Sequence, residues 1–66
     1  MNTMAMAKRL RDLRGYTPRR VVAENIGVSE ASITAYEMGE RVPRDAIKRK
    51  LADYYNTTVE AIFFSE

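Results

Sequence analysis

The side chains that most often perform catalysis are missing from this sequence. It contains no His and no Cys, which removes the usual general base, the thiol nucleophile and the common soft metal ligands. Its carboxylates are scattered singly, and it has no Gly-rich phosphate loop. Ser29 and Ser32 would need a nearby base to act as nucleophiles, and helix capping explains Ser29 without one. We therefore expect neither an enzyme, nor a cofactor, nor a bound metal.

Basic side chains are the remaining source of specific chemistry, and they are unevenly distributed. The net charge is only +2, but residues 1–44 carry eight Lys and Arg against five acids, whereas residues 45–66 carry three against four. A local basic excess attracts nucleic-acid phosphates, although basic residues can also simply form solvated helix faces. We favour the solvated role for Lys8 and Arg9, and a binding role for Arg19, Arg41 and Arg44.

The elements that must position these charges centre on residues 19–38, which show two short helical patterns joined by Gly27. Each pattern has one apolar stripe at helical spacing, Val22 with Ile26 and Ile33 with Tyr36. Gly27 can adopt the left-handed conformation that ends the first helix. Ser29 is the expected N-cap of the second. A short, bent connection of this kind predicts a helix-turn-helix.

Three more helices are expected around this unit, at about residues 3–13, 44–55 and 58–64. Their spacing predicts these buried residues: Met6, Leu10 and Leu13; Ile47, Leu51 and Tyr54; Val59, Ile62 and Phe63. Lys48, Arg49 and Lys50 are expected on a solvated face.

Helix boundaries can also be predicted. Thr17 is the expected N-cap of the helix that begins near Pro18, and Asn56 a left-handed stop. Thr57 and Glu60 form a capping-box pattern for the last helix. Arg19 and Arg20 lie in the first turn of their helix, where cations oppose the helix dipole and a bound phosphate would reverse the sign of that effect.

Length and composition limit the remaining possibilities. We expect the 66 residues, 45% apolar and 30% charged, to form one globular domain. No apolar run approaches the ~20 residues that cross a bilayer, and no targeting signal is visible. The cytoplasm is therefore the expected location.

The helix-turn-helix carries a family resemblance. Val22-Ala23, Gly27-Val28-Ser29, Ile33, Tyr36-Glu37 and Gly39 resemble the lambda-repressor-like, or Xre/Cro-type, helix-turn-helix family. The similarity extends from about Met6 to Phe64. It implies an all-α fold of five helices and a sequence-specific regulator of transcription that binds double-stranded DNA. A repressor that acts as a homodimer is the favoured form.

In that family the N-terminal half of the second helix of the unit, here about residues 29–38, enters the major groove. Base-reading positions correspond to Glu30, Ala31 and Ala35, with Ser32 and Thr34 either assisting or binding phosphate. This helix has no Arg, Lys, Gln or Asn, so the strong bidentate readers are missing. Thymine-methyl contacts by its Ala and Thr side chains would remain, with Glu30 accepting from a cytosine amino group.

Phosphate contacts are expected from residues beside the reading helix, namely Arg19, Arg20, Ser29, Arg41 and Arg44. Instead of a phosphate, Arg41 could contact a base edge or reach into the minor groove. Glu37 would be unfavourable beside DNA unless its charge were already engaged. The family pairs this Glu with an Arg late in the first helix, which here is Arg14, with Arg11 as the second choice.

Phe64 has no place on the inward face of the last helix. We expect it to form a dimer contact that spaces two reading helices by about 34 Å, which predicts an inverted-repeat operator. The alternative is that the terminus folds back and buries Phe64 in the core.

Two other functions stay open. One is a helical protein-interaction module, such as an antitoxin or accessory component, which the acidic Glu30 and the exposed alanines would suit. The other is RNA binding, although the sequence lacks an aromatic platform for stacking bases. The sequence shows no small-molecule site and no membrane contact.

Overall fold

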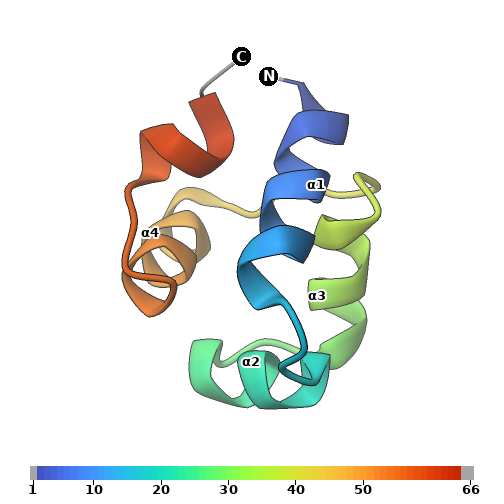
Figure 1. The fold of residues 1–66 in the computed structure, drawn as a ribbon. Helices are drawn as coiled ribbons and strands as arrows, with labels where there is room; N and C mark the ends of the chain where they lie inside the picture. The colour runs from blue at the N-terminus through green and yellow to red at the C-terminus, as the bar shows by residue number, and fades with distance from the viewer. Residues whose placement is uncertain (1, 65–66) are drawn as a thin grey trace.

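Five helices follow one another in the computed structural model, which describes residues 2–64. They are α1 (Thr3–Arg14), α2 (Arg19–Ile26), α3 (Glu30–Glu37), α4 (Asp45–Tyr54) and a short π-helix, η1 (Glu60–Phe64). α1 packs against α3 on one side and η1 on the other, while α2 closes the far end against α3 and α4 (Figure 1). The predicted all-α fold of five helices is confirmed. None of the described helices is both long and apolar enough to cross a membrane.

α1 begins and ends with local hydrogen bonds. The side chain of Asn2 accepts from the amides of Met4 and Ala5, and Gly15 ends the helix. The predicted inward stripe is only partly correct, since Leu13 is 40% exposed. The stripe instead passes through Ala7, Leu10 and Arg14, because the guanidinium of Arg14 points inward to a buried carboxylate.

The helix-turn-helix forms as expected at its turn. Gly27 has φ 85° and its amide donates to the carbonyl of Ala23 at 2.8 Å. The side chain of Ser29 then caps α3 by accepting from the amide of Ser32 at 3.0 Å. The prediction for the start of α2 was wrong. Pro18, not Thr17, is the N-cap, and it has no side chain that can cap.

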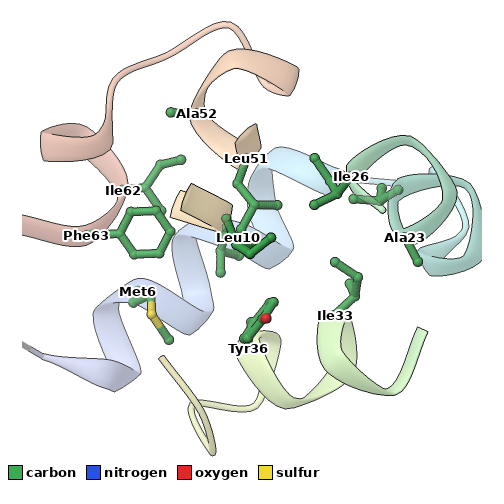
Figure 2. Packing of buried hydrophobic residues seen from close by; sticks show 12 residues of the cluster. Met6, Leu10, Ala23, Ile26, Ile33, Tyr36, Leu51, Ala52, Ile62 and Phe63 are labelled. Carbon is green, nitrogen blue, oxygen red and sulfur yellow. The ribbon is translucent and has the colours of Figure 1, made fainter. Parts of the chain in front are cut away.

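One apolar core joins all five helices. Leu10 of α1 and Leu51 of α4 lie at its centre (Figure 2). Tyr54, predicted to be buried, is 38% exposed. Tyr55 packs against the core in its place because it follows Leu51 by four residues, which puts it on the same helical face.

The end of the chain differs from the sequence prediction in two respects. Lys48, expected to be solvated, is only 9% exposed, and its Nζ lies 5.6 Å and 5.0 Å from the ring centroids of Phe63 and Phe64. The ammonium group thus bridges α4 and η1 by cation–π contacts. The side chain that caps the last turn is Thr58, which accepts from the amide of Ala61, rather than Thr57.

Arg9, expected on a solvated face, also joins this end of the molecule. Its Nη1 donates to the carbonyl of Ile62 at 3.1 Å and so ties α1 to η1. Lys8 does remain exposed, in an i, i+4 ion pair with Asp12. Phe64 is 57% exposed, so the alternative that it folds into the core is wrong.

Candidate nucleic-acid interface

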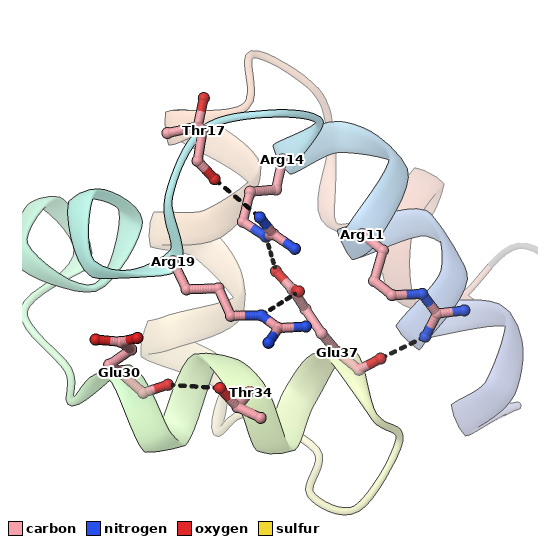
Figure 3. A network of polar contacts seen from close by, with 7 residues as sticks. All are labelled: Arg11, Arg14, Thr17, Arg19, Glu30, Thr34 and Glu37. Atoms are coloured by element: carbon pink, nitrogen blue, oxygen red, sulfur yellow. Dashed lines mark hydrogen bonds and ion pairs between the residues drawn. The ribbon is translucent and has the colours of Figure 1, made fainter.

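α3 buries one face and presents the other. Ile33, Tyr36 and Glu37 point inward, whereas Glu30 and Ala31 in the first turn are exposed. The other candidate reading residues, Ser32, Thr34 and Ala35, are half-buried. The hydroxyl of Thr34 donates to the carbonyl of Glu30 at 3.1 Å (Figure 3). This bond turns the Thr34 hydroxyl toward its own helix.

One flank of α3 faces the loop that leads to α4. The amides of Glu40 and Arg41 both donate to the carbonyl of Ala35, at 2.9 Å and 3.3 Å. The loop therefore folds back along α3. From there Nη1 of Arg41 reaches the hydroxyl of Ser32 at 3.1 Å, and Ser29 donates to the same oxygen at 3.0 Å.

An open groove of about 410 Å³ lies on this flank. Its lining combines hydroxyls and arginines with apolar side chains: Val28, Ser29, Ser32, Tyr36, Arg41, Val42, Arg44 and Ile47. The first turn of α3 borders it, and the amides of a helix N-terminus favour anions. The groove therefore brings together three of the side chains expected at phosphates, Ser29, Arg41 and Arg44.

The other flank is built around the buried carboxylate of Glu37, which is 1% exposed. Nε of Arg14 donates to Oε2 at 2.7 Å, and Nε of Arg19 donates to Oε1 at 2.9 Å (Figure 3). Arg11 donates to the backbone carbonyl of the same residue. Arg14 also donates to the carbonyl of Thr17 at 2.9 Å, which fixes the link between α1 and α2.

The sequence anticipated only part of this cluster. Arg14 is the expected partner of Glu37 and does contact its carboxylate, whereas Arg11 reaches the backbone. The bond from Arg19 was missed. Its position in the first turn of α2 was a usable signal, because a cation opposes the helix dipole there and needs a compensating anion. Arg20 differs, since it is exposed and pairs with Glu24 at 3.1 Å.

Two pKa values reflect the cluster. The hydrogen bond to Glu37 raises the pKa of Arg14, although burial works in the opposite direction. Burial, followed by the negative charge of Glu37, raises the pKa of Tyr55 to about 12. Arg14 thus stays cationic and Tyr55 stays neutral at ordinary pH. The negative charge of Glu37 is thus neutralised inside the protein, whereas that of Glu30 on the same helix is exposed.

The fold and this surface define a helix-turn-helix protein. Residues 5–62 match the family model described as "Helix-turn-helix domain". The chain belongs to this family, as the lambda-repressor-like resemblance predicted. Comparisons with curated proteins and with solved structures give no significant match. Family membership supports DNA binding as the general function.

Proposed function

We propose that this chain is a sequence-specific transcriptional regulator that binds double-stranded DNA in the cytoplasm and acts as a repressor. The observation that carries the proposal is the charge arrangement around α3. Arg19 lies on one flank and Arg41 with Arg44 on the other, while Glu37 is neutralised below the surface. An exposed helix with cations on both sides suits a major groove bordered by two phosphate backbones.

Base reading is proposed for the outward side chains of α3. Glu30 and Ala31 are exposed in the first turn, the part that enters the groove in this class of fold, and Thr34 and Ala35 follow at helical spacing. Glu30 would accept from a cytosine amino group, and the methyl groups would contact thymine. Because these contacts are few, much of the affinity is expected from the phosphates.

Phosphate binding is proposed for Arg19, Arg20, Ser29, Arg41 and Arg44. Arg20 and Arg44 are exposed, and Ser29 stands at the N-terminus of α3, where backbone amides can also donate to an anion. Contacts of this kind position a protein on the duplex without reading its sequence.

Selection of bound sites from a random duplex pool tests the proposal. The expected product is an enriched inverted repeat whose affinity falls with salt. A scrambled duplex and a matched RNA serve as controls. Equal binding to the scrambled duplex would refute sequence specificity, and tighter binding to RNA would favour the RNA alternative. If no duplex is bound at low salt, the helical protein-interaction module becomes the better hypothesis, since the outer face of α3 carries no Lys or Arg.

Homodimerisation is proposed through Phe64. Phe64 is 57% exposed and borders an open groove of about 390 Å³ formed with Asp45, Lys48, Arg49, Val59 and Glu60. Burying a Phe side chain contributes roughly 2 kcal/mol, and a two-fold contact uses the residue twice. Two modules on one operator would also bind more tightly through effective concentration.

Sedimentation equilibrium of the wild type and Phe64→Ala tests the dimer. We expect a wild-type dimer that dissociates at least tenfold more readily in the variant. Met38→Ala is the matched control, because Met38, the C-cap residue of α3, is another exposed apolar side chain at 54%. A wild-type monomer at high concentration would refute the dimer. A dimer that Phe64→Ala leaves unchanged would show that the contact lies elsewhere.

A further inference from the structure

The hydroxyl of Ser32 is already engaged by neighbouring side chains. Its oxygen accepts from Nη1 of Arg41 at 3.1 Å and from Oγ of Ser29 at 3.0 Å. A serine hydroxyl has two acceptor lone pairs and one donor hydrogen. Two neighbouring side chains therefore already engage this hydroxyl. Because its hydroxyl is engaged toward the Arg41 flank, Ser32 is less free to contact a base than the exposed Glu30 and Ala31.

Arg41 has the opposite properties. It is exposed, and its bond to Ser32 uses one of the five N–H donors of a guanidinium. The remaining donors can form the paired bonds that arginine makes with phosphate oxygens. Its backbone is attached at a second point on the same flank of α3, because its amide donates to the carbonyl of Ala35. Ser32 and Ala35 are three residues apart and lie one above the other on the helix.

We propose that Ser32 is a positioning residue, which orients the guanidinium of Arg41 for the DNA backbone rather than contacting a base. This role rests on the proposed DNA-binding function. An exposed arginine loses rotamer freedom when it binds. The bond to Ser32 removes part of that freedom before DNA arrives, so less is lost on binding. Ser29 extends the arrangement, since the residue that caps α3 also donates to Ser32.

The free protein gives a test that needs no DNA. The side-chain Nε–H resonance of Arg41 reports its mobility and its environment by NMR. Ser32→Ala should shift this resonance and increase its fast motion, and Ser32→Thr should restore both because it keeps the hydroxyl. Thr34→Ala is the matched control, since that hydroxyl bonds the carbonyl of Glu30. An Arg41 resonance that Ser32→Ala leaves unchanged would overturn the proposal.

A double-mutant cycle on the selected operator tests the functional part. Ser32→Ala should weaken binding about threefold to tenfold in the wild type, the range of one typical net hydrogen bond. It should have less than about a 1.5-fold effect when Arg41 is already Ala. The ranking of operator variants should not change with Ser32→Ala, whereas it should change with Thr34→Ala if that residue reads a base.

The outcomes separate this role from the proposed function. Equal, additive losses from Ser32→Ala with and without Arg41 would overturn the positioning role alone. An altered base preference in Ser32→Ala would do the same and assign Ser32 to base reading. If the wild type binds no duplex, the proposed function fails, and the role of Ser32 on DNA fails with it. Circular dichroism melting should show that each variant is folded.

Discussion

The protein holds the arginines on the two flanks of α3 in different ways. On one flank, Arg19 and Arg14 share the carboxylate of Glu37, which is almost completely buried. On the other, the side chain of Arg41 is held by the hydroxyl of Ser32 in an exposed loop. A buried ion pair is strongly coupled to folding, whereas an exposed hydrogen bond contributes little to stability.

The difference indicates a division of tasks. The Glu37 flank fixes how α1, α2 and α3 meet, and so sets the direction of α3, the proposed reading helix, before any ligand arrives. The side chain of Arg41 can change its conformation at little cost in stability, which suits the phosphate contact proposed for it. Substitutions on the first flank should therefore change stability, and those on the second should change binding alone.

The largest effect is expected for Glu37→Gln. The guanidinium groups of Arg14 and Arg19 would stay partly buried without their counter-charge, so the free energy of unfolding should fall by about 3 kcal/mol. Urea denaturation followed by circular dichroism measures this change. Glu30→Gln, an exposed carboxylate on the same helix, should change stability by less than about 0.5 kcal/mol. Equal effects of the two substitutions would remove the distinction between the flanks.

The second prediction compares the two arginines that share Glu37. The side chain of Arg14 is 17% exposed and that of Arg19 is 33% exposed. Arg14 also bonds the carbonyl of Thr17. Arg14→Met should therefore cost about 2 kcal/mol and Arg19→Met about 1 kcal/mol, because the more exposed pair is better screened. The same denaturation experiment measures both losses of stability. A larger loss for Arg19→Met than for Arg14→Met would show that the Glu37 carboxylate anchors α2 more strongly than it anchors the link between α1 and α2.

The third prediction separates stability from binding. Arg19→Ala and Arg41→Ala should each weaken binding to all duplexes about equally and lower the salt slope by about one unit. Only Arg19→Ala should also lower the melting temperature. Fluorescence anisotropy over a salt series, with thermal melting of the same samples, measures both quantities. A change in preferred sequence for Arg41→Ala, with no change in slope, would support its contact with a base edge instead.

The last effect is the smallest at neutral pH, because it appears only at high pH. The pKa of Tyr55 is raised in the folded protein from the usual 10.0 to about 12. Tyr55 therefore ionises at lower pH in the unfolded chain than in the folded protein. The stability that neutral Tyr55 contributes is fully present below pH 10 and is lost as the pH rises toward 12. Tyr55→Phe should lose less stability over this range than the wild type. Tyr16→Phe is the control, because Tyr16 is fully exposed, and an identical pH profile for the wild type and Tyr55→Phe would contradict the prediction.

Local rules made the helix-turn-helix predictable. Gly27 ends α2 with positive φ and Ser29 caps α3, both as their residue types indicate. Asn56 likewise adopts φ 57° after α4. The caps predicted at Thr17 and Thr57 were each wrong by one residue. Thr58 fits a cap by type as well as Thr57 does, whereas Pro18 takes the N-cap place of α2 although Thr17 is the better type. The spacing of residue types does not decide which of two adjacent residues caps a helix.

Side-chain burial was harder to predict where a polar or charged side chain takes an inward position. Leu13 and Tyr54 fit the apolar spacing, but Arg14 and Tyr55 occupy the corresponding inward places. Lys48 was expected in solvent and instead covers the rings of Phe63 and Phe64. A long cationic side chain can bury its stem and use its charge locally, and the spacing of apolar residues does not reveal this.

The sequence by itself determined the helices, the bend between α2 and α3, and the inward face of α3. These follow from backbone preferences and periodicity, which act between residues a few positions apart. Only the tertiary structure decided that Arg19 joins Arg14 at Glu37 and that Arg41 lies along α3 against Ser32. Those contacts join residues 18 and 9 positions apart. They depend on how three helices and a loop are packed, which no local pattern specifies.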